Sequence, residues 1–187
     1  EHKDATPEEL TIHEVNVGIM AIDSQRMMTW IERLDSNNAQ GEFYLTDIIG
    51  MAVEEGAVVA SAQPDELFEV TGVNDRVQLA ELERIYQKHQ AETLMREGVT
   101  LADPSRVDIR GNAKVGQDTF IDINVILEGD VEIGEGVSIG ANSIVRNSKI
   151  GRGTNIKENS LIENAKVGEA CQVGPFARIR PGTELSP

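Results

Sequence analysis

The chain has 187 residues, about 40% of them hydrophobic, which is enough for one large domain or two modest domains with real cores. Its 32 acidic and 17 basic residues give a formal net charge of −15. No Lys or Arg cluster stands out to overcome the repulsion of a phosphate backbone, so this composition argues against a nucleic-acid partner.

The single cysteine and the short apolar runs bear on the compartment of the protein and on membrane insertion. The single cysteine, Cys171, cannot form an internal disulfide, and no Cys or His pair has metal-ligand spacing, so we expect a reducing compartment and no structural zinc. No apolar run approaches the roughly 18–20 residues of a membrane span. Because the chain starts at Glu1 without a methionine, we expect a fragment of a longer protein.

Residues 1–76 show a mixed pattern that predicts an α/β domain, or the last part of one. A β-branched, partly alternating run over 12–22 predicts a strand, and residues 57–63 predict another, closed by a proline. Helical spacing predicts helices over 24–34 and 44–56.

Residues 77–98 contain no Gly or Pro before Gly98 and predict one long helix, with Asn74 or Asp75 as its N-cap. We interpret it as a linker between the first part, 1–76, and a C-terminal part, 99–187. The apolar residues expected near one face of this helix are Leu79, Leu82, Tyr86 and Leu94.

The C-terminal part contains a six-residue repeat of large aliphatic residues, with two steps of five. Its members are Ile109, Val115, Ile121, Leu127, Ile133, Ile139, Val145, Ile150, Ile156, Ile162, Val167, Val173, Ile179 and Leu185. Two residues before each stands a small or β-branched residue, Cys171 among them, and glycine often follows. Strand residues two apart share a face, so the pattern predicts a parallel β-helix of about four coils, with glycine at tight corners. Its open ends need caps, and the chain stops at Pro187 without one.

Several motifs in one order carry a family resemblance: EHKDAT at the start, NNAQGEFYLTDI (37–48), GVNDRVQL (72–79), the long helix and the hexapeptide array. Together they resemble the bacterial bifunctional N-acetylglucosamine-1-phosphate uridyltransferase/glucosamine-1-phosphate acetyltransferase family. The resemblance implies α/β followed by all-β: the C-terminal part of a Rossmann-like nucleotidyltransferase domain, a linker helix and a left-handed β-helix.

The family's chemistry is implied in the same way. Its N-terminal domain joins UTP and N-acetylglucosamine 1-phosphate into UDP-N-acetylglucosamine and pyrophosphate with Mg²⁺. Its β-helix, a homotrimer, transfers acetyl from acetyl-CoA to glucosamine 1-phosphate. The product would feed cell-envelope sugar synthesis, including peptidoglycan and lipopolysaccharide, in the bacterial cytoplasm.

The resemblance also implies site residues in the first part. Asn74 matches a ligand of Mg²⁺, for which an amide oxygen is a suitable hard donor; without the resemblance, a helix cap is the favoured interpretation. Glu1 and Asn16 match contacts to the product's sugar, and both residue types suit a polar sugar pocket. Tyr44 and Thr46 resemble further sugar-side contacts, with core packing an equally good interpretation.

In the β-helix, Arg180 matches an arginine that binds the sugar phosphate, a role suited to bidentate guanidinium hydrogen bonds. The resemblance assigns no catalytic residue to this chain. His2, His13 and His89 all precede the β-helix and do not replace the family's general base. We therefore expect an active parent enzyme and an inactive fragment. The alternatives are a hexapeptide-repeat sugar nucleotidyltransferase without acetyltransferase activity and a noncatalytic β-helix scaffold.

Overall fold

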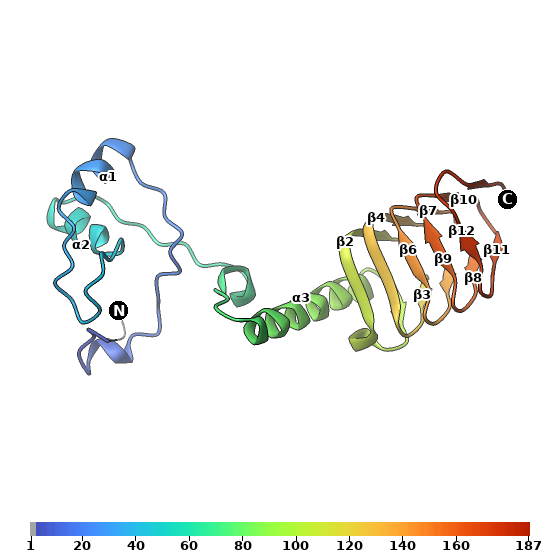
Figure 1. Ribbon diagram of the computed structural model, residues 1–187, viewed down its shortest axis with the longest axis horizontal. Helices are drawn as coiled ribbons and strands as arrows, with labels where there is room; N and C mark the ends of the chain where they lie inside the picture. The colour runs from blue at the N-terminus through green and yellow to red at the C-terminus, as the bar shows by residue number, and fades with distance from the viewer. Residues whose placement is uncertain (1–2) are drawn as a thin grey trace. The chain divides into compact units, whose positions relative to one another are not determined.

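The computed structural model describes residues 3–187 and divides into two compact units, Glu1–Gly72 and Val73–Pro187 (Figure 1). Each unit has a separate hydrophobic core. The predicted division into 1–76, 77–98 and 99–187 places the long helix by itself, whereas contacts group it with the strands.

The first unit is built on two short helices, α1 (Ser24–Ile31) and α2 (Asp47–Glu54), and the 3₁₀ turns η1 (Glu9–Thr11) and η2 (Leu67–Val70). Both helices lie within their predicted ranges. Their buried side chains are Trp30, Ile48 and Ala52, with Met20, Ile22, Leu34, Met51 and Ala57 packed around them. The indole of Trp30 donates to Glu55 at 3.0 Å, and Arg33 pairs with the same carboxylate. These two donors hold the pKa of Glu55 below its usual value.

The strands expected over 12–22 and 57–63 do not form among the described residues of this unit. Both segments run without regular structure, and several of their aliphatic side chains are exposed, including Val15 (74%), Ile19 (75%) and Val58 (97%). A strand exists only when a neighbour accepts and donates its backbone hydrogen bonds, and the described part of unit 1 supplies no such neighbour. The β-branched pattern was therefore insufficient by itself to predict a strand.

The second unit begins with the predicted long helix, α3 (Arg76–Arg96). Asp75 is its N-cap, because its carboxylate accepts from the Gln78 N–H at 2.8 Å. The buried residues of α3 are Gln87, Ala91 and Leu94, spaced by about one turn. Of the residues predicted near one face, Leu94 is buried, whereas Leu79 and Tyr86 are 55% and 46% exposed. Only the C-terminal half of α3 is therefore packed.

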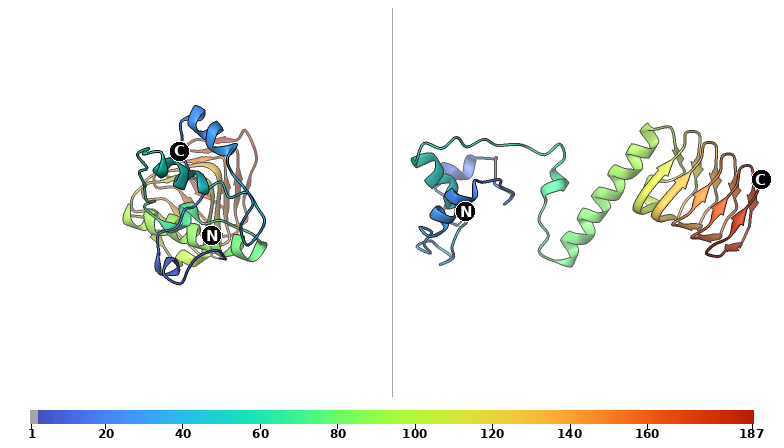
Figure 2. Two further views of the ribbon diagram at one scale, coloured as in Figure 1. Left: turned by 90° about the vertical axis from the view of Figure 1, so that its left-hand side faces the viewer. Right: turned by 90° about the horizontal axis from the view of Figure 1, so that it is seen from above.

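The strands that follow form a parallel β-helix, which confirms the central prediction (Figures 1 and 2). One face is the sheet β1-β3-β5-β8-β11. The other strands form two ladders that share β2 and β4, and every pairing is parallel. The strands are β1 (Thr100–Leu101), β2 (Val107–Val115), β3 (Phe120–Ile121), β4 (Val125–Ile133), β5 (Ser138–Ile139), β6 (Ile144–Arg146), β7 (Lys149–Ile150), β8 (Asn155–Ile156), β9 (Leu161–Glu163), β10 (Lys166–Val167), β11 (Gln172–Val173), β12 (Arg178–Ile179) and β13 (Glu184–Leu185). A 3₁₀ turn, η3 (Pro104–Arg106), separates β1 from β2.

The predicted repeat residues line the core of this β-helix. All fourteen aliphatic positions are buried or packed against the core cluster. The small polar residues two positions earlier, such as Thr119, Ser143 and Thr154, are also buried. Their hydroxyls donate to backbone carbonyls, as Thr154 does to Gly168 at 2.7 Å. The two steps of five arise where the coil shortens: Val107 pairs with Val125, whereas Ile133 pairs with Ile150.

The reason for glycine at the corners differs from the expected one. At Gly134 and Gly140 an added Cβ would lie 2.7 Å from the backbone N of Arg152 and Glu158 in the next coil. These glycines therefore permit close stacking of coils, not an unusual φ. Positive φ angles occur instead at other corner residues, including Asn142 (59°).

Candidate functional site

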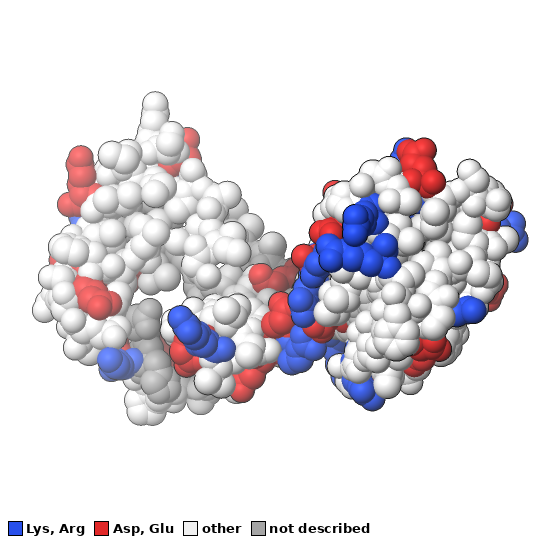
Figure 3. Space-filling model, turned by 45° about the vertical axis from the view of Figure 1, so that its right-hand side comes forward, with Lys and Arg blue, Asp and Glu red and all other residues white. Residues whose placement is uncertain are grey.

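The outer surface of the β-helix carries rows of side chains set by the strand register. One row alternates in charge, because the strand register sets Arg110 beside Glu128, Glu128 beside Arg146, and Arg146 beside Glu163. Arg146 donates to Glu128 at 2.9 Å. Figure 3 shows basic and acidic side chains interspersed on this unit. The outward charges largely compensate one another, so most of the net negative charge belongs to the first unit, which has 15 acidic and 3 basic residues.

Arg180, the predicted phosphate-binding residue, extends this row. It follows Ile179, which pairs with Ile162, so the register places Arg180 in the next coil beside Glu163. Its side chain is exposed. An exposed guanidinium at the end of a charge row can donate hydrogen bonds to a phosphate without losing a contact in the core.

Tyr44 lies in a small polar network of the first unit. Its hydroxyl donates to the Asp4 carboxylate at 3.1 Å and accepts from the Gln40 amide at 2.8 Å. Asp4 also accepts from the Ala39 N–H at 2.7 Å, and Lys3 donates to Gln40 at 3.1 Å. The network fixes the segment around Tyr44 against the start of the chain. Sequence analysis missed Asp4 and Gln40, although both lie within the motifs EHKDAT and NNAQGEFYLTDI.

The other predicted sugar contacts have local roles. The amide of Asn16 accepts from the Gly18 N–H at 2.7 Å, which makes a compact turn, and the residue is exposed. Thr46 is half-buried at the N-cap of α2 but makes no side-chain capping bond. Glu1 lies outside the described residues.

Asn74, the predicted Mg²⁺ ligand, belongs to the second unit, at the start of α3. Its backbone N–H donates to Gln78 at 2.8 Å, while Asp75 supplies the cap. The capping interpretation of the Asn74 side chain is therefore wrong. An amide oxygen is a hard donor of the kind that Mg²⁺ takes. Within residues 3–187 no three His, Cys, Asp or Glu side chains form a metal-binding group.

The structure thus separates the predicted residues into three places. Tyr44 and Thr46 are close in sequence in unit 1, Asn74 begins unit 2, and Arg180 lies in its last coils.

The fold and the strand register show the class of protein: it is a hexapeptide-repeat protein with a parallel β-helix. Residues 104–186 match the family model for the GMPPB C-terminal domain. Over 186 residues the chain is 55% identical to the "Bifunctional protein GlmU" of Acinetobacter baylyi, and 53% identical to those of Acinetobacter baumannii and Chromobacterium violaceum. The chain is therefore a segment of a GlmU-family protein, as the motifs predicted.

These matches cover the whole of this chain but only 41% of each relative. A serine acetyltransferase isoform 3 from Entamoeba histolytica, solved with cysteine, aligns with 58% of this chain and 42% of its own at 17% identity. Its TM-score of 0.34 is too low to bear on function. None of the helices within residues 3–187 has the length and apolarity needed to cross a membrane.

Proposed function

We propose that the longer protein containing this chain is an enzyme with two activities: acetyl transfer from acetyl-CoA to glucosamine 1-phosphate, then uridylyl transfer from UTP to N-acetylglucosamine 1-phosphate. The product is UDP-N-acetylglucosamine, made in the bacterial cytoplasm. The observation that carries the proposal is the match at 55% identity, over the whole of this chain and 41% of the relative, to a bifunctional GlmU protein, together with the β-helix.

For uridylyl transfer, the proposed contribution of this chain is one Mg²⁺ ligand, Asn74, and sugar contacts from Glu1, Asn16, Tyr44 and Thr46. Bound Mg²⁺ would neutralise charge on the transferring phosphoryl group. The Asp4–Tyr44–Gln40 network supports this role, because a hydroxyl with fixed partners keeps a defined orientation toward a sugar.

For acetyl transfer, the proposed contribution is phosphate binding by Arg180 on a trimeric β-helix. A row of outward aliphatic side chains, Ile126, Ile144 and Leu161, lies beside the charge row and is half-buried. Such a row favours contact with a second copy of the chain. By itself the 187-residue chain lacks the groups for either transfer, so we expect it to be inactive.

The test is pyrophosphate release from UTP and N-acetylglucosamine 1-phosphate, measured against Mg²⁺ concentration in the longer protein. Asn74→Ala should lower activity at least about tenfold and raise the Mg²⁺ concentration needed for half-maximal rate. The 187-residue chain by itself should release no pyrophosphate.

Asp75→Ala is the matched control, since it removes the cap of α3 and leaves the amide of Asn74 in place. It should lower thermal stability without changing the Mg²⁺ dependence. Equal Mg²⁺ dependence in Asn74→Ala and the unmodified protein would refute the ligand role. If the longer protein released no pyrophosphate from UTP, the uridyltransferase proposal would be refuted and a noncatalytic β-helix scaffold would be favoured.

A further inference from the structure

The first coil of the β-helix has one edge that no strand covers among the described residues. β2 pairs along its length with β4 on one side. On its other side lies α3, at the end of the stack of coils (Figure 2). An uncovered strand edge exposes backbone N–H and C=O groups that can pair with any other strand.

One side chain of α3 takes the place of a strand at this edge. The amide oxygen of Gln87 accepts from the Ile109 N–H at 2.8 Å, and its amide nitrogen donates to the Ile109 carbonyl at 2.7 Å. A side-chain amide presents the same donor and acceptor as a peptide group. Gln87 therefore satisfies both backbone groups of one edge residue at once.

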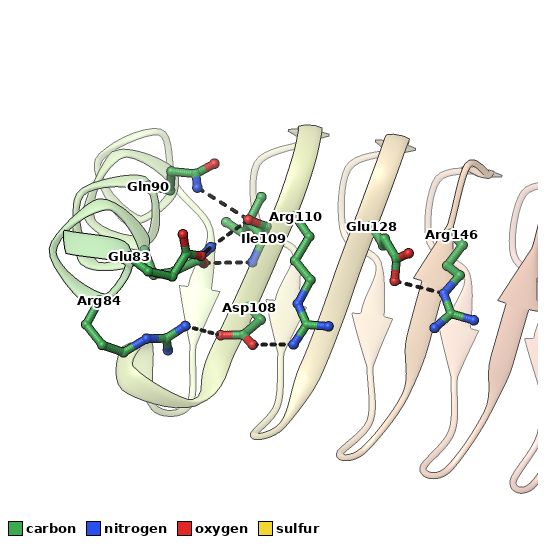
Figure 4. Close-up of polar contacts among 9 residues, drawn as sticks. Glu83, Arg84, Gln90, Asp108, Ile109, Arg110, Glu128 and Arg146 are labelled. Atoms are coloured by element: carbon green, nitrogen blue, oxygen red, sulfur yellow. Dashed lines mark hydrogen bonds and ion pairs between the residues drawn. The ribbon is translucent and has the colours of Figure 1, made fainter. Parts of the chain in front are cut away.

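The contact is buried and complete. Gln87 is 4% exposed, and its amide nitrogen also donates to Glu83 at 2.9 Å. Gln90 donates to the same Ile109 carbonyl at 3.4 Å (Figure 4). A buried amide costs free energy unless its hydrogen bonds are made. The hydrogen bonds to Ile109 and Glu83 meet this requirement for Gln87.

Apolar packing and an ion pair also hold α3 on the coil. Ala91 and Leu94, on the same face as Gln87, belong to the core cluster that includes Ile109. Arg84 of α3 donates to Asp108 at 3.0 Å, and Arg110 donates to the other oxygen of that carboxylate at 2.8 Å (Figure 4).

We propose that α3 is an intramolecular cap of the β-helix, in which Gln87 substitutes for a strand residue and closes the edge of β2. Closing that edge prevents its pairing with a strand of a second copy of this chain. The helix is thus an autoinhibitory element for edge-to-edge association as well as a connection between the two units. This inference depends on neither transferase activity.

The experiment uses the whole 187-residue chain and three variants. Gln87→Ala removes the amide and its volume; Gln87→Met keeps most of the volume and removes the hydrogen bonds, so it isolates the polar contact if the alanine variant folds poorly. Gln78→Ala makes the same substitution at an exposed position of α3, where the amide oxygen accepts from the Asn74 N–H and not from Ile109. Amide hydrogen exchange of Ile109 and sedimentation velocity over a range of concentrations are the two readouts.

We expect Ile109 exchange to accelerate on the order of tenfold in Gln87→Met and to stay unchanged in Gln78→Ala. Both Gln87 variants should sediment as larger species than the unmodified chain at equal concentration. Unchanged protection of Ile109 in Gln87→Met would overturn the role of Gln87. Accelerated exchange with unchanged sedimentation would overturn the role of the cap in preventing association.

Discussion

Corner residues of the β-helix fall into two groups with different physical demands. Some have positive φ and empty space around them, such as Gly136 (φ 63°), with Asp118 (φ 59°) at the same corner of the preceding coil. Others, such as Gly140, have no room for a side chain because the next coil passes within 2.7 Å of the Cβ position. Glycine is essential only in the second group, since Asn and Asp tolerate positive φ.

Gly140→Ala should therefore destabilise the chain by about 1–3 kcal/mol, because the backbone of Glu158 must move away. Gly136→Asn, the control, should cost less than about 1 kcal/mol, since its corner is open and αL is accessible to Asn. Urea denaturation followed by circular dichroism measures both. Equal losses in the two variants would contradict the explanation that coil spacing requires glycine at Gly140.

At the scale of elements, α3 and β2 are joined by Asp108, whose carboxylate lies between Arg110 and Arg84. The hydrogen bond from Arg110, followed by that from Arg84, lowers the pKa of Asp108 below its ordinary value of 3.8. A lowered pKa in the folded state stabilises the fold above the unfolded pKa, and this contribution disappears as pH falls through the folded pKa.

Asp108→Asn should accordingly lower stability by about 0.5–1 kcal/mol at pH 7, the range for a partly exposed ion pair. The difference from the unmodified chain should shrink as pH falls below about 4. Thermal denaturation at pH 7, 5 and 3 measures it. Glu135→Gln is the control, because its pair with Arg152 at 3.6 Å is more exposed and should contribute less. A difference that stays constant down to pH 3 would contradict the ion-pair explanation.

At the scale of the molecule, the two units have cores of very different extent. Unit 1 buries Trp30, Ile48 and Ala52, whereas unit 2 buries a continuous stack of aliphatic residues that extends to Val173. Stability follows buried apolar area, so unit 1 should unfold at a lower denaturant concentration than unit 2. Trp30 is the only tryptophan, so its fluorescence reports unit 1 alone.

We expect the fluorescence transition of Trp30 to precede the β-sheet circular-dichroism transition in urea. Ile139→Ala, in the β-helix core, should shift the circular-dichroism midpoint by the equivalent of about 2–5 kcal/mol and leave the fluorescence midpoint unchanged. Ala52→Gly, in the core of unit 1, should lower the fluorescence midpoint by a smaller amount and leave the circular-dichroism midpoint unchanged. Coincident transitions in all three chains would mean that the units unfold as one.

The sequence by itself determined the β-helix, its core residues and the family. A period of six, with small partners two positions earlier, is a local signal because each coil repeats the same inward positions. The helices α1, α2 and α3 also followed from local spacing and capping, and Asp75 was one of two predicted caps. Motif order was sufficient for the family, since 55% identity extends over the whole chain.

Only the tertiary structure decided which neighbours these elements have. Strands expected at 12–22 and 57–63 needed partners that no local pattern can supply, and in their absence those segments stay irregular. The close approach of coils at Gly140 and the burial of Gln87 against Ile109 depend on residues far apart in the chain. A glutamine in a helix is ordinarily a surface residue; it becomes a cap only because folding places an unpaired strand edge beside it.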